Sequence, residues 1–295
     1  MMKKLPQIFL VLIAAVTASA YDWPVADGYL TATFGELRGD HFHDGIDIGG
    51  GKQPVFPVER GEVVFYFEEG QDLNDIPTGL GTFVLVEHPL NFRSLYSHLD
   101  SLNARSGAVS PEIPLGVMGD TGYSLGVHLH LTLVDRQLDK KVNPLLLLPS
   151  QPDPQKPVIN SVYLTDDSGK ISLPVKELIG TSNYLLSAEI YDPCHETDYF
   201  CPAAPYEIFV LVNGRERFRI RYEALEETDG NEYLMPGDGA DSASYYIGNS
   251  WEINLGMVTV NRGNTFIEIV VADAAGNIVR KTYTVSAGTG DEEKP

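Results

Sequence analysis

Two histidines lie two residues apart in a segment whose side chains alternate as they do on a β-strand. Residues 122–133 read Gly-Tyr-Ser-Leu-Gly-Val-His-Leu-His-Leu-Thr-Leu, so a glycine turn is followed by apolar residues interleaved with His128 and His130. Side chains two residues apart on a strand share one face of the sheet, which places both imidazoles on the same face. Burying two imidazoles is costly unless their ring nitrogens find partners. The simplest such partner is a metal ion.

A second segment upstream carries further candidate ligands. His43 and Asp47 are four residues apart, a spacing that brings the two side chains to one side of the chain in either a strand or a helix. With His130 they would offer two imidazoles and one carboxylate, a set that suits zinc, which in catalytic sites keeps a fourth position for water. His98 and His128 are then candidates for proton transfer. Spacing alone does not say which histidines bind metal and which do the chemistry.

The sequence around these candidates indicates an all-β fold. Between residues 21 and 149, short segments rich in β-branched and aromatic residues alternate with glycine-rich turns, and their close spacing favours antiparallel sheet over βαβ units. The clearest expected strands are residues 28–34, 61–67, 82–87 and 92–97. The polar, turn-rich residues 68–81 are expected to form a surface loop.

A second domain is expected after a proline-rich linker at residues 150–157. Four prolines stand in the nine residues from Pro149 to Pro157, and they stiffen the chain and remove backbone donors. Residues 158–286 contain further strand patterns, among them hairpins that turn at Asn213-Gly214 and within residues 273–277. The last of these hairpins resembles the closing hairpin of bacterial immunoglobulin-like domains. We therefore expect an immunoglobulin-like β-sandwich there and a disordered tail at residues 287–295.

The N-terminal residues are typical of a secretory signal peptide. Lys3 and Lys4 precede an apolar run at residues 8–16, and Ala-Ser-Ala at residues 18–20 fits the small residues of a cleavage site. The run is too short to span a bilayer comfortably, and no later stretch is apolar enough to do so. We expect cleavage after Ala20, no membrane span in the mature chain, and a periplasmic or secreted protein.

The charge and the cysteines narrow the function further. With 21 basic and 41 acidic residues the formal net charge is 21 − 41 = −20. A nucleic-acid partner requires the opposite sign, so none is expected. Cys194 and Cys201 lie close together in a chain expected to be exported, which favours a local disulfide, with two free thiols as the alternative.

Three segments resemble the successive motifs of the lysostaphin-type (LytM-type) zinc metalloendopeptidases, which cut peptide bonds in bacterial peptidoglycan. They are His-Asp-Gly-Ile-Asp at residues 43–47, Tyr-Ser-His-Leu at 96–99 and Gly-Val-His-Leu-His at 126–130. Phe-Gly at 34–35 and Gly-Asp-Thr-Gly at 119–122 also match. The order and separation of the motifs agree over residues 28–134. The resemblance implies an antiparallel-sheet metallopeptidase domain at residues 21–149.

The same resemblance assigns a role to each of the five polar residues. His43, Asp47 and His130 would bind one Zn²⁺ ion, and His98 and His128 would be the histidines that orient and deprotonate the water and stabilise the developing oxyanion. The substrate would be the stem peptides or cross-bridges of peptidoglycan. The C-terminal domain could position the enzyme on the wall, bind an envelope protein partner or act as a spacer.

The sequence departs from the family pattern in three places. Leu131 and Thr132 replace the Phe-Glu that often follows the last motif, residues 68–81 form a longer insertion than usual, and no tyrosine lies between Tyr29 and His43. These departures bear on substrate choice more than on chemistry. We expect Arg38, near the first motif, to form a surface salt bridge, with steering of a substrate carboxylate as the alternative.

Two other functions are compatible with part of this pattern. A non-catalytic relative could use the same fold to bind peptidoglycan and activate a cell-wall amidase, although such proteins typically lack ligand residues. A mononuclear iron oxygenase also uses two histidines and a carboxylate. The four-residue gap between His43 and Asp47, the export signal and the two additional histidines count against the oxygenase.

Overall fold

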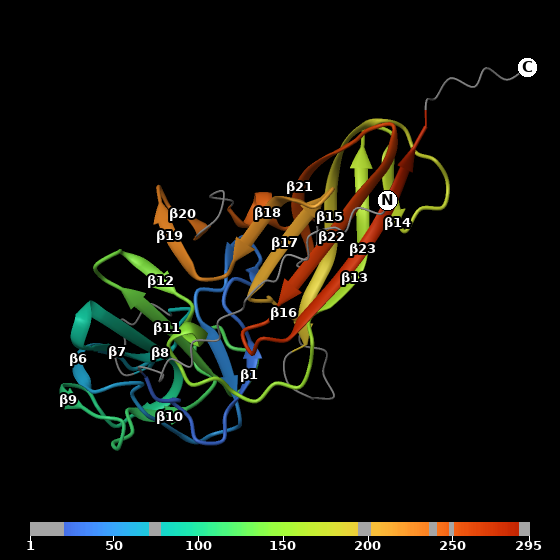
Figure 1. Ribbon diagram of the computed structural model, residues 1–295. Helices are drawn as coiled ribbons and strands as arrows, with labels where there is room; N and C mark the ends of the chain where they lie inside the picture. Colours follow the sequence, from blue (N-terminus) through green and yellow to red (C-terminus); the bar gives the residue numbers. More distant parts are fainter. Residues whose placement is uncertain (1–20, 71–77, 194–201, 236–240, 248–250, 289–295) are drawn as a thin grey trace, which may run out of the picture.

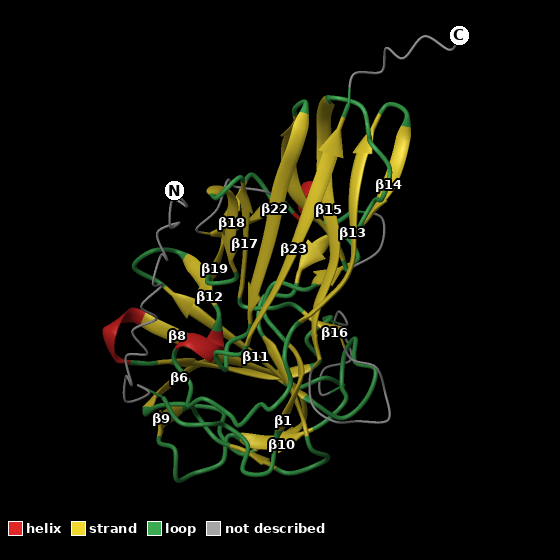
Figure 2. Ribbon diagram, turned by 45° about the vertical axis from the view of Figure 1, so that its right-hand side comes forward, coloured by secondary structure: helices red, strands yellow, loops and turns green. Residues whose placement is uncertain are grey.

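The computed structural model describes residues 21–70, 78–193, 202–235, 241–247 and 251–288. These residues form antiparallel sheets almost throughout, in a first part built on one large sheet and a second part that is a β-sandwich, which confirms the predicted all-β fold class (Figures 1 and 2). Nowhere in these ranges is there a helix of the length and apolarity needed to cross a membrane. The predicted signal peptide, both cysteines and residues 289–295 of the predicted tail lie outside the described residues.

The first part of the chain builds one large sheet in which β12, β11, β8, β7, β6 and β9 are neighbours in that order. Strand β4 pairs with β11 and β1, and β10 pairs with β8 and β5. The strands are β1 (Tyr29–Ala32), β4 (Ile46–Gly49), β5 (Pro54–Val55), β6 (Gly61–Phe67), β7 (Thr82–Glu87), β8 (Phe92–Leu102), β9 (Gly107–Val109), β10 (Gly116–Met118), β11 (Leu129–Asp135) and β12 (Lys140–Val142). A short hairpin of β2 (Leu37–Arg38) and β3 (His41–Phe42) precedes β4.

Side chains alternate along the central strands, so core residues lie on one face of the sheet and candidate site residues lie on the other. In β11, Leu129, Leu131 and Leu133 are fully buried in the hydrophobic core of the first part. His130 and Thr132 point to the opposite face, because successive side chains of a strand alternate. The sheet therefore offers one apolar face and one face on which polar side chains gather.

The second part is a sandwich of two antiparallel sheets. One contains β14, β13, β15, β16 and β21, and the other contains β18, β17, β22 and β23. The strands are β13 (Val158–Asp166), β14 (Gly169–Leu173), β15 (Ser182–Pro193), β16 (Pro202–Ala203), β17 (Glu207–Val212), β18 (Arg215–Arg221), β21 (Glu252–Val260), β22 (Gly263–Ala272) and β23 (Ile278–Ala287). Asn213 and Gly214 both have positive φ angles, 51° and 76°, so the predicted Asn-Gly turn of the β17–β18 hairpin is confirmed.

The two parts are joined by more than the proline-rich segment. A hairpin of β19 (Ala224–Thr228) and β20 (Asn231–Met235) extends the first sheet, because β19 pairs with β12 (Figure 1). In the opposite direction, Phe34 and Phe42 are buried in the core of the sandwich, where Phe42 contacts Tyr245 with 6.2 Å between ring centroids. Residues 150–157 contain no helix or strand. The domain limits drawn from the sequence stay a prediction, and the structure adds these contacts across them.

Candidate metal centre

The pairing of β4 with β11 brings together the two segments that carry the predicted metal ligands. Asp47 on β4 lies directly opposite His130 on β11 in the antiparallel ladder. His43 lies in the turn between β3 and β4, where its backbone N–H donates to Glu36 O and its carbonyl accepts from Gly35 N–H. The ligand candidates thus come from adjacent backbone segments although 83 residues separate Asp47 from His130.

Gly45 permits this turn to lie against β11. A Cβ atom at residue 45 would stand 2.3 Å from the backbone oxygen of Leu131, a separation that no side chain tolerates. The glycine in the His-Asp-Gly-Ile-Asp segment is therefore required by the close approach of two backbones. This contact fixes the distance between the turn that carries His43 and the strand that carries His130.

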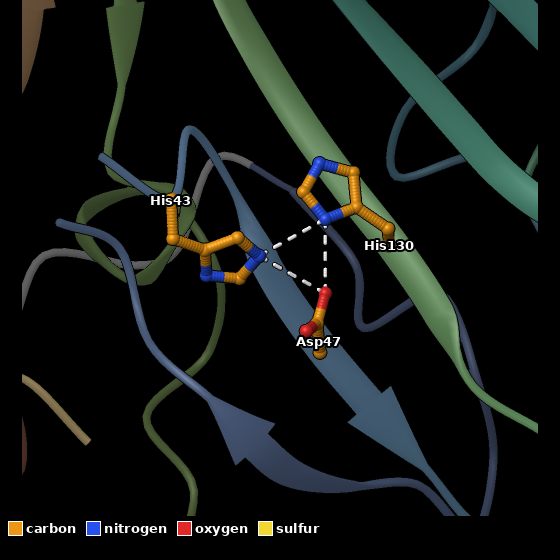
Figure 3. Close-up of side chains that lie close together, drawn as sticks. All are labelled: His43, Asp47 and His130. Atoms are coloured by element: carbon orange, nitrogen blue, oxygen red, sulfur yellow. Dashed lines mark hydrogen bonds and ion pairs between the residues drawn. The ribbon is translucent and has the colours of Figure 1, made fainter. Parts of the chain in front are cut away.

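Three side-chain atoms converge at the centre of the cluster (Figure 3). His43 Nε2 lies 3.1 Å from Asp47 Oδ1 and 3.0 Å from His130 Nδ1, and His130 Nδ1 lies 2.9 Å from Asp47 Oδ1. All three residues are buried. In a tetrahedral zinc site with bonds of about 2.0–2.1 Å, neighbouring ligand atoms stand about 3.3–3.4 Å apart. The observed triangle is close to that size.

The hydrogen bonds around the cluster leave unprotonated atoms facing its centre. His43 Nδ1–H donates to Thr33 O at 2.8 Å, so Nε2 of the neutral ring carries the lone pair. His130 Nε2 lies 3.1 Å from Asp44 Oδ1, and donating to that carboxylate leaves its Nδ1 as the inward lone pair. Two imidazole lone pairs and the Asp47 carboxylate therefore meet at one point, an arrangement that requires a proton or a metal cation.

The pKa shifts of Asp47 and His130 in the metal-free cluster indicate the same need for positive charge. Burial alone would raise the pKa of Asp47, but the charges of His43 and His130 and their hydrogen bonds hold it well below its ordinary value. Burial alone would lower the pKa of His130, but hydrogen bonds to Asp44 and Asp47 and their negative charges raise it to about 9. Without metal, a proton on His130 supplies the cation, and a metal ion would replace it.

A second layer of side chains holds the candidate ligands, and the sequence did not reveal it. Asp44 accepts from His130 with Oδ1 and pairs with Lys141 on β12 through Oδ2 at 2.8 Å. Lys141 also pairs with Glu232 of β20 at 2.7 Å. Thr132 Oγ1 lies 2.9 Å from His130 Nε2, and its position two residues after His130 on the same strand face was the available signal. Such partners orient metal-bound imidazoles and raise their basicity.

Arg38 is also part of this surrounding layer. Its Nη2 lies 3.0 Å from Asp47 Oδ2 and 3.4 Å from Glu36 Oε2, so the expected salt bridge is present. One of its partners, however, is the candidate ligand itself. Because Oδ2 of Asp47 is held by Arg38, Oδ1 is left facing the two histidines.

The two remaining histidines border the cluster. The ring centroids of His98 and His128 are 4.8 Å apart, and those of His98 and His130 are 6.0 Å apart. His128 Nε2 lies 3.8 Å from Asp47 Oδ1. The structure thus brings all five residues selected from the sequence into one group. It gives the three ligand candidates inward-facing atoms and places the other two beside them.

His98 occupies an irregular position in β8. Its φ angle is +61°, and the pairing of β8 with both β7 and β10 shifts register next to it. A bulge of this kind turns a side chain away from its regular direction, and a non-glycine residue in this region of φ is uncommon. His98 Nδ1–H donates to Thr121 O at 2.8 Å, which leaves Nε2 able to accept a proton. Burial lowers the pKa of His98 to about 4, with the nearby charges of His128 and His130 acting in the same direction.

His128 is held in a similar way from the loop before β11. Its Nδ1 lies 2.8 Å from Gly126 O and 3.2 Å from Ser124 Oγ. A carbonyl oxygen only accepts, so Nδ1 is the donor and Nε2 is free to accept a proton near Asp47. On the same loop, which leads to His128, Tyr123 and Leu125 expose large apolar side chains to solvent.

Comparison with known proteins places these residues in a family. A sequence model of peptidase family M23 matches residues 41–144, a range that contains all five residues. This part of the chain is a LytM-type M23 domain. The resemblance inferred from the three segments is confirmed. A second family model, which carries no functional description, matches residues 156–287. Peptidases of family M23 are zinc-dependent, and the donor set described above fits that metal.

Among the relatives of this M23 domain, one is named as an activator and another as a peptidase. The murein hydrolase activator NlpD of Salmonella typhimurium is 33% identical over 135 residues, which cover 45% of this chain and 32% of NlpD. The DD-carboxypeptidase/endopeptidase Mpg of Neisseria meningitidis is 32% identical over 89 residues, which cover 30% of this chain and 19% of Mpg. The chain thus spans a third or less of the length of these curated relatives.

Among solved structures, the catalytic domain of the prophage-encoded M23 protein EnpA from Enterococcus faecalis is 26% identical, with a TM-score of 0.35. That similarity covers 40% of this chain and 90% of the EnpA chain. A zinc-containing peptidase from Vibrio cholerae is 23% identical, with a TM-score of 0.37 over 45% of this chain and 41% of that one.

Proposed function

We propose that the M23 domain of this protein is an exported zinc metalloendopeptidase that hydrolyses peptide cross-links of bacterial peptidoglycan. The observation that carries the proposal is the convergence of His43 Nε2, Asp47 Oδ1 and His130 Nδ1 within 3.1 Å of one another, next to two histidines that do not belong to that triangle. A protein that only binds peptidoglycan has no need of such an arrangement.

In this proposal the five residues divide into ligands and proton-transfer groups. His43, Asp47 and His130 would hold one Zn²⁺ ion, which lowers the pKa of a bound water toward about 7 and polarises a carbonyl group. His98 and His128, each fixed through Nδ1–H to a backbone carbonyl, present Nε2 as an acceptor. Between them they would take the proton from the attacking water, return it to the leaving amine and stabilise the developing oxyanion, effects worth about 10²–10⁴-fold for general acid–base catalysis.

The substrate is proposed from the family and from the surface beside the site. Of the relatives that match this part of the chain, NlpD is named as a murein hydrolase activator and Mpg as a DD-carboxypeptidase/endopeptidase. Tyr123 and Leu125, exposed on the loop that leads to His128, would contact an extended peptide, and the stem peptides or cross-bridges of peptidoglycan are peptides of that kind. The predicted signal peptide would export the protein to the compartment that contains them.

A second candidate function is activation of another murein hydrolase. The similarity to NlpD, whose name describes an activator, favours it. The complete set of ligand candidates and the support given to it by Asp44, Thr132 and Arg38 favour the peptidase. The two functions differ in a measurable way, because an activator releases no wall peptides by itself.

Digestion of purified sacculi by residues 21–295 tests the proposal, with bound zinc and released fragments followed by mass spectrometry. We expect about one zinc per chain and newly exposed amino groups in the products. His43→Ala should remove both, whereas His41→Ala should change neither, because His41 is two residues away, exposed and paired only with Asp40 among the described residues. Stoichiometric zinc without any cleavage of cross-linked sacculi would reject the peptidase and leave the activator.

A further inference from the structure

Three carboxylates that do not belong to the M23 site gather where the proline-rich segment meets the sandwich. Asp153 lies in residues 150–157, Asp192 lies near the end of β15, and Asp273 follows β22. One carboxylate oxygen from each lies within 4.8 Å of the others. Asp192 and Asp273 are buried, with 7% and 3% of their surface exposed, and Asp153 is partly exposed.

No positive charge among the described residues balances this cluster. The groups that act on Asp192 are the two other aspartates, and no lysine, arginine or histidine pairs with any of the three. Asp192 Oδ1 is inaccessible to solvent and has no hydrogen-bond partner. A buried carboxylate oxygen without a partner is costly, and this one belongs to a carboxylate that is grouped with two others within 4.8 Å. This orphaned oxygen is the observation that indicates a missing cation.

The other two carboxylates are already fixed in position. Asp273 accepts from the backbone N–H of Asn277 with Oδ1 and from its side-chain amide with Oδ2, each at 2.8 Å. The same amide donates to Asp153 O at 3.0 Å, and Asp153 Oδ1 accepts from Gln155 N–H. Each carboxylate oxygen has a second lone pair, so these bonds orient the oxygens without using them up.

A cavity beside the cluster gives room for water ligands. Its volume is about 420 Å³, and Asp153 and Asp192 line it together with Gly28, Leu30 and Phe34 of the first part of the chain. Calcium takes six to eight oxygen ligands at about 2.3–2.6 Å, so three carboxylates would have to be completed by water. Oxygens on opposite sides of Ca²⁺ stand at most about 5 Å apart, so oxygens that all lie within 4.8 Å of one another can share one Ca²⁺ ion. Mg²⁺ usually keeps several waters and is bound by one or two carboxylates, so a set of three carboxylates favours Ca²⁺.

We propose that Asp153, Asp192 and Asp273 bind one calcium ion at the junction between the proline-rich segment and the sandwich. The donors are oxygens only, which excludes zinc as the preferred metal and separates this site from the M23 site. The ion would tie residues 150–157 to the end of the sandwich and so fix the segment that leads out of the M23 domain. Extracellular calcium modules bind with dissociation constants of about 10⁻⁴–10⁻³ M, and an affinity in that range is expected.

Calorimetric titration and thermal unfolding of chelator-treated residues 21–295 test the site, with CaCl₂ and MgCl₂ compared at constant ionic strength. We expect one Ca²⁺ per chain. For a dissociation constant near 10⁻⁴ M, the unfolding temperature should rise by about 5–10 °C at 10 mM Ca²⁺. Asp192→Asn should weaken Ca²⁺ binding at least tenfold and should raise the unfolding temperature of the calcium-free protein, because asparagine can be buried there without either a charge or a bound proton. Asp167→Asn is the control, because Asp167 is exposed in the turn after β13, at the end of the sandwich away from Asp192.

Several outcomes would overturn the proposal. They are no Ca²⁺ response of the unaltered protein, an equal response to Mg²⁺, a full response in Asp192→Asn, or a response that disappears in His43→Ala and therefore belongs to the M23 site. If Asp192→Asn does not fold, Asp153→Asn at the partly exposed position replaces it with the same expected loss of Ca²⁺ binding. None of these results depends on peptidase activity.

Discussion

Replacement of Asp44 by asparagine tests whether the layer behind the metal centre sets its affinity. Asp44 is the partner of His130 Nε2 at 3.1 Å, on the side of the ring away from the cluster. Asparagine keeps the shape and one acceptor oxygen but removes the negative charge that makes the ring a stronger ligand. Lys141, the other partner of Asp44, keeps its ion pair with Glu232 at 2.7 Å, so the change leaves no unpaired cation behind. The effect should therefore be confined to His130.

The expected size of the effect follows from the role of such partners in metal sites. Loss of a hydrogen-bonded carboxylate behind a metal-bound histidine typically lowers metal affinity about 10–100-fold. At 25 °C this corresponds to about 1.4–2.7 kcal/mol of binding free energy. The lower end applies if the asparagine oxygen still accepts from Nε2–H, and the upper end if the amide turns its NH₂ group toward the ring.

Competition for zinc against a chelating indicator at pH 7.5 measures the change directly. Asp40→Asn is the matched control, because Asp40 lies four residues earlier, is fully exposed and forms an ion pair only with His41 among the described residues. A zinc affinity of Asp44→Asn within threefold of the unaltered protein, with an unchanged unfolding temperature, would refute the idea that this carboxylate supports the ligand.

Three further predictions concern roles and pH. His98→Gln and His128→Gln should each keep stoichiometric zinc while lowering the rate of sacculus digestion by about 10²–10⁴-fold, and zinc loss in both would refute their assignment as non-ligands. Because the pKa of His130 in the metal-free protein is raised to about 9, zinc must displace a proton from His130 when it binds. Below pH 9 the apparent zinc affinity should therefore rise about tenfold per pH unit. Calorimetry in two buffers should detect one proton released per zinc bound at about pH 7.5. Burial and the neighbouring Asp273 and Asp153 raise the pKa of Asp192 from 3.8 to about 8, so folding favours its protonated form. The calcium-free protein should then lose stability as the pH rises from about 4 to 8, by at most about 5 kcal/mol, and chemical unfolding of Asp192→Asn should show a smaller dependence.

Much of the fold and the centre of the site could be predicted from local sequence. Period-two alternation marks strands such as β7, whose residues are alternately buried and partly exposed, and Asn213-Gly214 marks the hairpin of β17 and β18. His43, Asp47 and His130 stand in short segments whose residue types suit a metal. These signals are local, so they can be read without knowledge of which strands pair.

The parts that sequence did not reveal depend on contacts between distant residues. The pairing of β12 with β19 and the burial of Phe34 in the sandwich core leave no periodic trace in either segment. Lys141 meets Asp44 only because β12 and β11 are neighbours in the folded sheet. The aspartate cluster likewise draws its members from three separate segments. The positive φ angle of His98 is imposed by the bulge in β8, and no residue type at that position indicates it.

The strand pairing between β12 and β19 also determines how the protein can be dissected. Removing everything after the proline-rich segment would leave Lys140–Val142 as a bare sheet edge with unsatisfied N–H and C=O groups, a surface that recruits other strands. It would also strip Phe42 of the aromatic rings that cover it. A shortened M23 fragment should therefore self-associate, and any drop in its activity would measure solubility rather than a wall-binding role of the sandwich. Point substitutions in the intact chain are the sounder means of separating the two halves.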